Sequence, residues 1–338
     1  MGQDSSATPS PGLSLRSRQR KYYFCVSKLW PLLLLPLILS GCAKVNATTV
    51  PDVSGRTIKA VATTGMIGDI VTNVAGERVE LSTLMGPGID PHLYKASEGD
   101  VQDLVEADVI FYNGLHLEAK MSDVLERLEG GVITAAVTSR LPRSELLRPP
   151  QFAGAYDPHV WFDVRYWMEA ARTVRDTLEE LDPAHAELYQ RNAGRYLRDL
   201  EELDREVRML TATVPDGRRV LVTAHDAFNY FGRAYGFEVR GLQGISTATE
   251  AGTGDVQDLA RFIADRRIPA VFVESSDSQR TIEAVREAVR SRGFDVQIGG
   301  QLYSDAMGDP GTPDGTYMGM VRHNVRTIVT ALRGEIEP

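Results

Sequence analysis

The sequence predicts an α/β protein made of two lobes, each a β/α sandwich with a mainly parallel sheet, joined by one long connector helix. Two observations predict this fold class. Short apolar segments alternate with amphipathic helical segments in both halves of the chain, which is typical of βαβ units and parallel sheets. Between the halves, a helical pattern continues for roughly 30 residues without a breaker, or about 45 Å at the rise of an α-helix. An ordinary peripheral helix is the alternative for that segment.

The first 41 residues have the pattern of a signal peptide. An apolar stretch, 29–39, follows a basic segment that contains Arg16, Arg18, Arg20, Lys21 and Lys28. The stretch is shorter than the roughly 20 residues that span a bilayer. It ends in Leu39-Ser40-Gly41-Cys42, which resembles the lipobox of bacterial lipoproteins; the alternative is an ordinary signal peptide with a chance cysteine. We expect residues 1–41 to be removed and Cys42 to be lipidated, so that the exported protein is anchored to a cell membrane and faces the periplasm or the cell exterior.

The cysteines and the net charge limit the kinds of site and of binding partner that the chain can have. Cys25 lies in the leader, so Cys42 is the sole cysteine of the expected mature chain. This excludes an intramolecular disulfide, a thiolate metal site and a cysteine nucleophile from the folded part. The whole chain has a net charge of −9, and because the leader carries five basic residues and Asp4, the remainder has a net charge of −13. Such an acidic chain is poorly suited to nucleic acid and attracts cations, although acidity also serves solubility.

The first lobe is expected at 57–181, after a polar tether at 42–56. Ser97 and Asp100 form a capping-box pattern at the start of one of its helices. The expected strands of this lobe are 57–63, 79–85, 108–112 and 132–137, and its expected helices are 65–75, 98–106, 117–128 and 166–181.

The connector helix is expected at 182–213, with Pro183 at its first helical position. Its apolar residues recur every three or four positions and form one stripe: Tyr196, Leu200, Leu203, Val207 and Leu210. The second lobe is expected at 214–338. Its expected strands are 219–223, 237–242, 270–273 and 295–298, and its expected helices begin near 227 and cover 255–266, 280–292 and 317–332.

The tripeptide Asp-Pro-His occurs twice, at Asp90-Pro91-His92 and Asp157-Pro158-His159, in a chain with six histidines. Proline fixes its own φ and biases the preceding residue towards extended conformations. Each copy therefore predicts a stiff loop that presents an imidazole in a set direction. Asp-Pro is also a common turn starter, so the histidine of either copy alone could be incidental.

His225 directly follows an expected strand of the second lobe, and Asp305 lies in a loop after the last one. Ligands of open α/β sheets bind beyond the carboxyl ends of the strands, where His92, His159 and His225 are all placed. Three neutral imidazoles and one carboxylate suit a divalent first-row metal. The chain has no His-x-x-His spacing, so such a site would be assembled from distant segments.

Six segments of the chain resemble the zinc and manganese solute-binding lipoproteins of bacterial ABC transporters, the TroA-like group of cluster A-I. They span nearly the whole expected mature chain in order: Gly88–Tyr94, Tyr112–Glu118, Asp157–Trp161, His225–Phe231, Phe272–Ser276 and Ser304–Gly308. The resemblance implies two α/β lobes joined by a single long helix, with a metal ion in the cleft between them. Its implied ligands are His92, His159, His225 and Asp305.

The same resemblance implies a monomer that carries one Mn²⁺ or Zn²⁺ ion as cargo, with Fe²⁺ less suited. It implies delivery of the ion to the membrane permease and ATPase subunits of a metal ABC transporter. In some manganese-binding members the third ligand is a glutamate, where this chain has His225. Zinc-specific members often carry a His-rich acidic insertion in the first lobe. This chain has none between Leu117 and Phe152, which weakens the case for a strictly zinc-specific importer.

Other residues near these segments have expected supporting roles. Glu274 ends an expected buried strand, and we expect it to orient an imidazole from behind; a weak extra oxygen donor is the alternative. Asp90 and Asp157 are expected to fix their loops, and Trp161 to form a wall of the cleft.

The remaining histidines have plainer interpretations. His116 lies in a matching segment but not at a ligand position, and we expect it to make a structural hydrogen bond. His185, in the first turn of the connector, is expected in solvent. His323 is expected on the surface or in packing of the closing helix.

A binding protein, not an enzyme, is the leading hypothesis. Four protein ligands form a closed shell, whereas catalytic zinc keeps an open position for water. A secreted metallohydrolase would need that position and a general base, for which Glu274 is the candidate, but no Gly-x-Ser-x-Gly or His-Glu-x-x-His motif supports it. A surface adhesin lipoprotein fits the anchor and the acidity but leaves the four loops unexplained.

Overall fold

The computed structural model describes residues 51–128, 130–149 and 154–333. The expected signal peptide and Cys42 lie outside these residues, so both stay predictions. In the described ranges, no helix has both the length and the apolar character that crossing a membrane requires. Packing begins within the expected tether, because Val53 is buried and Arg56 pairs with Asp108 at 2.5 Å.

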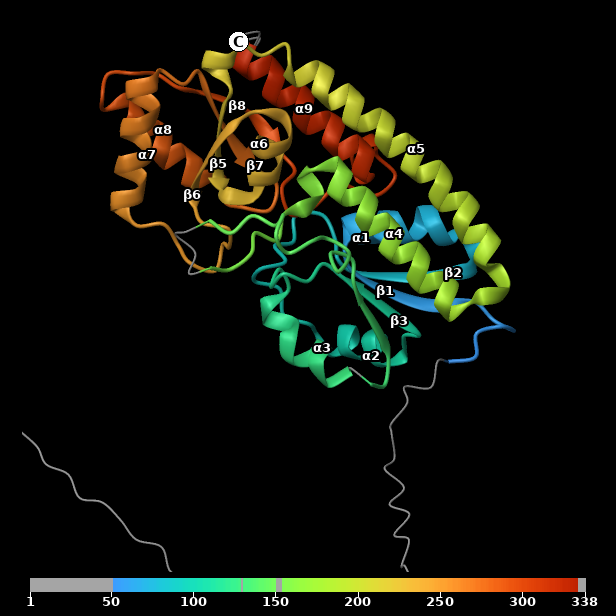
Figure 1. Cartoon of the computed structure of the whole chain (residues 1–338). Coiled ribbons are helices and arrows are strands. Elements are labelled where there is room, and N and C mark those ends of the chain that lie inside the picture. The colour runs from blue at the N-terminus through green and yellow to red at the C-terminus, as the bar shows by residue number, and fades with distance from the viewer. Residues whose placement is uncertain (1–50, 129, 150–153, 334–338) are drawn as a thin grey trace, which may run out of the picture. The chain divides into compact units, whose positions relative to one another are not determined.

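The first lobe is built on a four-stranded parallel sheet with the order β2-β1-β3-β4, of which β1, β2 and β3 are labelled in Figure 1. Ser97 and Asp100 form the expected capping box at the start of its second helix. The strands and helices of this lobe are β1 (Ile58–Thr64), α1 (Gly65–Ala75), β2 (Val79–Met85), α2 (Glu98–Glu106), β3 (Val109–Tyr112), α3 (Ser122–Leu128), β4 (Ile133–Ala136) and α4 (Val164–Leu181).

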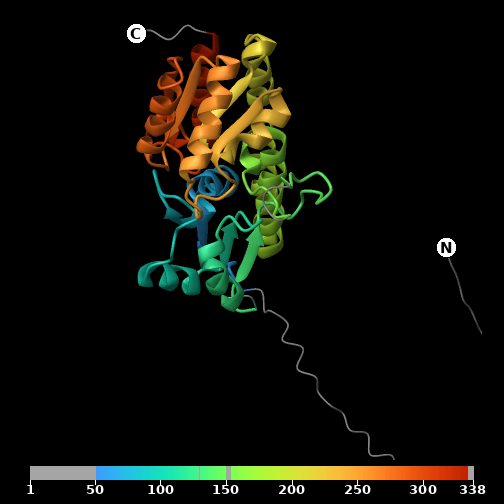
Figure 2. The same cartoon turned by 90° about the vertical axis from the view of Figure 1, so that its left-hand side faces the viewer.

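The second lobe contains two parallel strand pairs, β5-β6 and β7-β8, and β5 lies beside β7. Helices lie on both sides of these strands (Figures 1 and 2). All pairings in the described sheets are parallel, which agrees with the predicted fold class. The elements are β5 (Val220–His225), α6 (Asn229–Tyr235), β6 (Glu238–Gln243), α7 (Thr253–Arg266), β7 (Ala270–Glu274), α8 (Gln279–Arg290), β8 (Gln297–Leu302) and α9 (Tyr317–Arg333).

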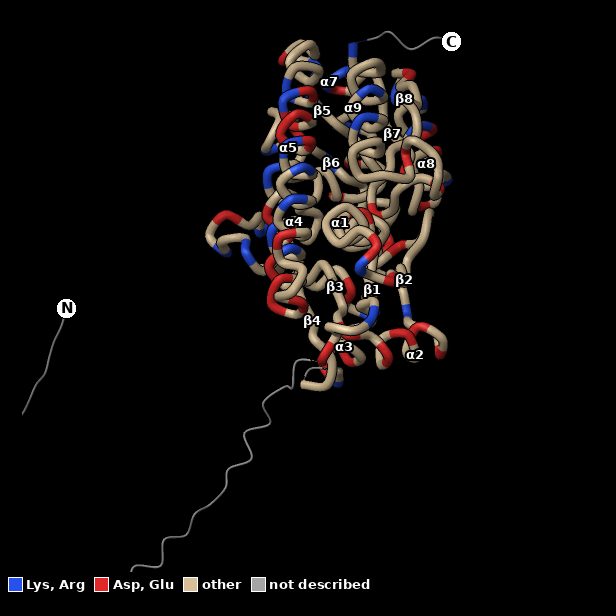
Figure 3. The backbone as a smooth tube through the Cα atoms, turned by 90° about the vertical axis from the view of Figure 1, so that its right-hand side faces the viewer, with Lys and Arg blue, Asp and Glu red and all other residues tan. Residues whose placement is uncertain are grey.

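The connector is α5 (Ala186–Thr211), whose 26 residues make it the longest helix in the part of the chain that the structure describes. It packs on α1 and α4 of the first lobe and on α9 of the second (Figure 1). Tyr196 in its apolar stripe donates a hydrogen bond to Asp69 of α1 at 2.8 Å. Charges of both signs lie along the helix (Figure 3), and Glu206 pairs with Arg322 of α9 at 2.7 Å. One helix therefore contacts both lobes through apolar and charged contacts.

Two of the predicted helices begin later than expected. Pro183–His185 form a separate 3₁₀ turn before α5. Asp182 directly precedes this turn, and its carboxylate contacts Arg78 at 2.7 Å. In the segment expected to be helical at 117–128, a 3₁₀ turn, Ala119–Met121, precedes α3. Local helical periodicity cannot reveal either turn, and before α5 the contact between Asp182 and Arg78 joins residues far apart in the chain.

The buried side chains of the strands lie in three apolar cores. Successive residues of a strand point to opposite faces of its sheet, so one strand contributes to two of these cores. In β3, Val109 and Phe111 enter one core and Ile110 enters another. In β7, Phe272 enters the first of these cores, and Val271 enters a third. Each lobe thus has an outer core of its own, and both contribute to one shared core.

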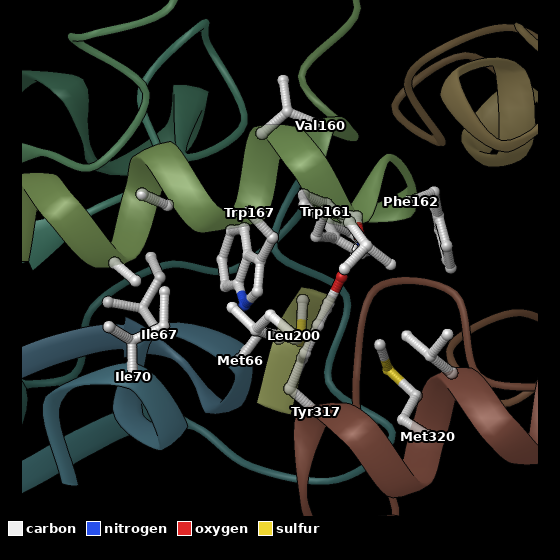
Figure 4. Packing of buried hydrophobic residues seen from close by; sticks show 14 of the residues in the cluster. Met66, Ile67, Ile70, Val160, Trp161, Phe162, Trp167, Leu200, Tyr317 and Met320 are labelled. Atoms are coloured by element: carbon white, nitrogen blue, oxygen red, sulfur yellow. Dashed lines mark hydrogen bonds between the residues drawn. The ribbon is translucent and has the colours of Figure 1, made fainter. Parts of the chain in front are cut away.

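The shared core contains buried residues from both lobes and from α4 and α5. Figure 4 shows Trp167 of α4 beside Tyr317 of α9 and Leu200 of α5. The rings of Trp167 and Tyr317 stack with centroids 5.3 Å apart, and neither side chain is exposed. The two lobes are therefore joined by continuous packing as well as by the connector helix.

Candidate metal centre

Four buried side chains from distant segments meet where the two lobes face each other. His92 lies in the loop after β2, and His159 directly precedes the 3₁₀ turn that leads into α4. His225 is the last residue of β5, and Asp305 follows β8. The structure therefore brings together the four residues that the sequence predicted as ligands, and each offers one ligand atom within 4.8 Å of all the others.

The distances between these atoms fit a small metal ion. The Nε2 atom of His159 lies 3.2 Å from Nε2 of His92 and 3.3 Å from Nε2 of His225. The carboxylate of Asp305 lies 3.2 Å from Nε2 of His225, 3.5 Å from that of His159 and 3.7 Å from that of His92. Four donors placed tetrahedrally around Zn²⁺ at about 2.1 Å would be about 3.4 Å apart. The donor set has the size and chemistry of a cage for a first-row divalent ion.

Asp305 is the clearest sign that this cage is built for a cation. Both of its carboxylate oxygens are buried and make no hydrogen bond with the residues that the structure describes. Burial alone would raise the pKa of Asp305, but the imidazoles of His225, His159 and His92 hold it well below its usual range. A buried, ionised carboxylate without hydrogen bonds is costly unless a charge compensates it. A metal ion bound to the three imidazoles would supply that charge.

The two Asp-Pro-His tripeptides form the same hydrogen-bonded turn. In each copy the aspartate carboxylate accepts a hydrogen bond from the backbone N–H of the histidine two residues later, at 2.8 Å for Asp90 and 3.0 Å for Asp157. This Asx-type turn sets the direction of the imidazole. Both aspartates fix their loops, as expected.

Two of the three imidazoles also have a carboxylate behind them. Asp157 lies 2.7 Å from Nδ1 of His159, and Glu274 lies 2.7 Å from Nδ1 of His225. Glu274 also accepts a hydrogen bond from the backbone N–H of His225 at 2.9 Å. A carboxylate at Nδ1 fixes the tautomer that leaves Nε2 free for metal. The Asp157–His159 pair is an addition to the predicted site, and the spacing of the two residues in the tripeptide was its only signal in the sequence.

His92 differs from the other two histidines. In the described ranges the only carboxylate that contacts its imidazole is Asp305, on the nitrogen that faces the other three side chains. Burial, and to a lesser degree the neighbouring histidines, lower the pKa of His92 to about 3. By contrast, the carboxylates of Glu274 and Asp305 raise the pKa of His225 well above its usual value, although burial opposes them. The pKa values of His92 and His225 are therefore shifted in opposite directions within one site.

Replacing Glu274 by glutamine is expected to weaken metal binding by roughly 10- to 100-fold, because the amide cannot hold the Nδ1 proton of His225 as a carboxylate does. Competition with a chromophoric chelator measures the change. The control is Glu287→Gln on α8, where the carboxylate is exposed. Equal affinities for the two variants would show that Glu274 does not support His225.

Trp161 does not form a wall of the cleft, because only 1% of it is exposed. Its ring packs on that of His159, and its indole N–H donates to the carbonyl of Ser304 at 3.0 Å. The apolar Val160-Trp161-Phe162 turn draws this side chain into the shared core. Trp161 thereby ties the loop of one predicted ligand, His159, to the loop of another, Asp305.

His116 makes no side-chain hydrogen bond or ion pair with the described residues, contrary to the structural hydrogen bond expected from the sequence. It is exposed, and it follows Gly114 and Leu115 in a left-handed turn with φ of 81°, 56° and 66° for the three residues. Such backbone costs roughly 1–2 kcal/mol at each non-glycine residue. The turn is held by buried Glu118, whose carboxylate accepts hydrogen bonds from the backbone N–H groups of Asn113 (2.6 Å) and Gly114 (3.2 Å).

The two remaining histidines lie far from the site in sequence and have local partners. Nδ1 of His185 lies 3.0 Å from Asp182, so His185 is bound at the start of the connector and is not simply in solvent. His323 packs on Tyr303 and lies 3.0 Å from the carbonyl of Gln301. His323 therefore takes part in packing, which was one of the two roles expected for it.

Comparison with known proteins shows which family the chain belongs to. The profile of the family described as zinc-uptake complex component A, periplasmic, matches residues 60–331. The chain is 53% identical over 272 residues to the zinc-binding protein TroA of Treponema pallidum, which covers 80% of this chain and 88% of TroA. It is 46% identical over 302 residues to the manganese-binding lipoprotein MntA of Bacillus subtilis, which covers 89% of this chain and 97% of MntA.

More distantly, it is 29% identical over 309 residues to the manganese ABC transporter substrate-binding lipoprotein PsaA of Streptococcus mitis, covering 90% of this chain and 97% of PsaA. The solved structure of T. pallidum TroA matches with a TM-score of 0.80 and 52% identity, covering 82% of this chain and 99% of that one. The match includes both lobes. The chain belongs to the zinc-uptake complex component A family and has the two-lobe fold of TroA.

Proposed function

We propose that the protein is an extracytoplasmic solute-binding protein that captures one Zn²⁺ or Mn²⁺ ion and delivers it to the permease of a metal ABC transporter. The ligands are His92, His159, His225 and Asp305. The observation that carries the proposal is the buried Asp305 carboxylate, which has no hydrogen-bond partner and faces three imidazole nitrogens. A transported cation supplies the missing partner and leaves again on delivery.

Binding is a better account of this site than hydrolysis. A catalytic metal needs an open coordination position and a nearby general base. Glu274, the candidate base, has one oxygen at Nδ1 of His225 and the other on the backbone N–H of the same residue. With its carboxylate engaged in this way, Glu274 is poorly placed to take a proton from a metal-bound water. An adhesin role, in turn, gives no reason for a buried metal cage.

The proposal includes a lipid anchor at Cys42 after removal of residues 1–41, a short tether, a first lobe at 57–181, a connector at 182–213 and a second lobe at 214–338. The named lipoproteins among the relatives, MntA and PsaA, support the anchor. Metabolic labelling with a radioactive or clickable fatty acid tests it. Labelling that persists in Cys42→Ser would contradict an anchor at Cys42.

Metal analysis of the protein from its native host tests the function itself. We expect about one Zn²⁺ or Mn²⁺ ion per chain, and the same metal should restore growth to a deletion strain in metal-poor medium. Intrinsic affinity follows the Irving–Williams order, so Zn²⁺ is expected to bind tighter in vitro even if Mn²⁺ is the cargo. Purified protein without transition metal, together with normal growth of the deletion strain in metal-poor medium, would contradict the proposal.

Metal binding is expected to release protons. The carboxylates of Glu274 and Asp305 raise the pKa of His225 well above its usual value, so a proton on this imidazole competes with the ion. His92, with a pKa of about 3, has no proton to lose. Affinity should therefore rise with pH through the neutral range and fall as the pH is lowered. Calorimetry in buffers of different ionisation enthalpy counts the protons, and a binding enthalpy independent of the buffer would contradict the raised pKa.

A further inference from the structure

A cavity of about 720 Å³ adjoins the metal centre, and it opens onto only one of the four ligands. His92 lines it, whereas His159, His225 and Asp305 do not. In the part of the chain that the structure describes, no carboxylate lies behind the imidazole of His92, whereas Asp157 and Glu274 lie behind the other two. An ion that enters or leaves through this cavity therefore meets the least constrained ligand of the cage first.

The walls of this cavity favour cations. They contain the carboxylates of Asp226, Glu250 and Asp255, and none of the described residues that line the cavity is Lys or Arg. Gln243 also lines it, and the Oε1 atom of this residue is buried without a hydrogen-bond partner. Two other cavities of the structure, by contrast, include Arg143 or Arg322 in their linings. Carboxylates in a concave wall raise the local concentration of cations and their rate of association.

His116 lies in the wall of the same cavity. Its imidazole is exposed and makes no hydrogen bond or ion pair with described residues. The left-handed turn Gly114-Leu115-His116 that presents it is held from below by the buried carboxylate of Glu118. An unoccupied imidazole is a ready ligand for the metals that suit the main cage.

We propose that this cavity is the route of the metal ion and that His116 is a transit ligand on it, which binds the ion briefly between solvent and His92. The inference rests on the proposed function, because it assumes a transition metal as cargo. His116 does not join the final four-ligand cage. Its contribution is therefore to the rates of loading and release.

This role has a kinetic signature that distinguishes it from a structural one. A transit ligand stabilises the ion on its way in and on its way out equally. Losing it lowers the association and dissociation rate constants by the same factor and leaves their ratio, Kd, unchanged. A residue that merely supported the cage would instead change Kd, chiefly through faster dissociation.

The experiment compares wild type with His116→Asn by stopped-flow mixing of the full-length protein with Zn²⁺, and by chelator-triggered release. Asparagine tolerates left-handed backbone, so the turn is retained. Both rate constants are expected to fall by about tenfold, the lower end of the range over which mutations at one site change association rates. His116→Gly, which also accepts this backbone, serves as a second variant if His116→Asn unfolds. His185→Asn, at the start of the connector, controls for the loss of a partly exposed imidazole away from the cage and is expected to leave both rates unchanged.

Unchanged rates in both His116 variants would overturn the transit role and leave the proposed function intact, since wild type would still bind metal. Weaker equilibrium binding with an unchanged association rate would overturn it as well, because it would make His116 a support of the cage. Failure of the wild-type protein to bind Zn²⁺ or Mn²⁺ would instead refute the proposed function.

Discussion

Asp305→Asn is expected to lower the affinity for Zn²⁺ by a factor on the order of 10²–10³. The substitution keeps the shape of the side chain but removes the carboxylate that, alone among the described residues, lies within 3.7 Å of all three imidazoles. The side chains that hold the ion would then carry no charge of their own, so the ion would lose the carboxylate that compensates its charge directly. Competition with a chelator of known affinity measures the loss, and it should also abolish most of the metal-induced rise in Tm.

Asp309→Asn is the matched control, because Asp309 is an exposed carboxylate four residues further along the same loop. It is expected to bind metal as wild type does. The metal-free circular dichroism spectrum of Asp305→Asn should match that of wild type, since neither oxygen of Asp305 makes a hydrogen bond that the fold would lose. Near-wild-type Zn²⁺ affinity in Asp305→Asn would contradict the four-ligand cage.

Trp167→Ala is expected to lower the free energy of unfolding by about 3–5 kcal/mol, the range for removing a fully buried aromatic side chain. Trp167 is not exposed, and it stacks on Tyr317 at the junction of α4, α5 and α9. Because the core around it belongs to both lobes, the whole described structure should unfold in one transition at lower urea concentration. Urea denaturation followed by far-UV circular dichroism measures the shift.

Met209→Ala on α5 is the control for this prediction. Met209 is 68% exposed, so its truncation is expected to change stability by less than about 0.5 kcal/mol. Calorimetry adds a second criterion. Two separate transitions in wild type, of which Trp167→Ala shifts only one, would mean that the lobes are independent and that the shared core does not couple them.

The fold could be predicted wherever local signals mark the ends of elements. Residues 79–85 and 98–106 were predicted to the residue, since the first is followed by a loop of glycine and proline and the second begins with a capping box. The starts of α3 and α5 could not be predicted from periodicity. The backbone there depends on Glu118 binding back to Asn113 and on Asp182 reaching Arg78.

The four proposed ligands could be named from the sequence because they lie in motifs, although their spacing gave no sign that they would meet. The contacts and the cavity around these four residues were harder to predict. The contact of Asp157 with the imidazole of His159 depends on side-chain torsions within one turn. The cavity beside His92 and the unpartnered state of His116 arise from packing between loops more than 100 residues apart in the chain, such as those of His116 and Glu250.

The core shared by the two lobes has a consequence for how such proteins can diversify. Lobes that meet only through a linker can be recombined as modules, but here Phe111 of one lobe and Phe272 of the other belong to the same packed interior. A chimaera that joins the first lobe of this chain to the second lobe of a distant relative would bring together surfaces that were never fitted to each other. Changes of cargo are therefore easier to reach by substitutions in the loops around the cage than by exchange of whole lobes.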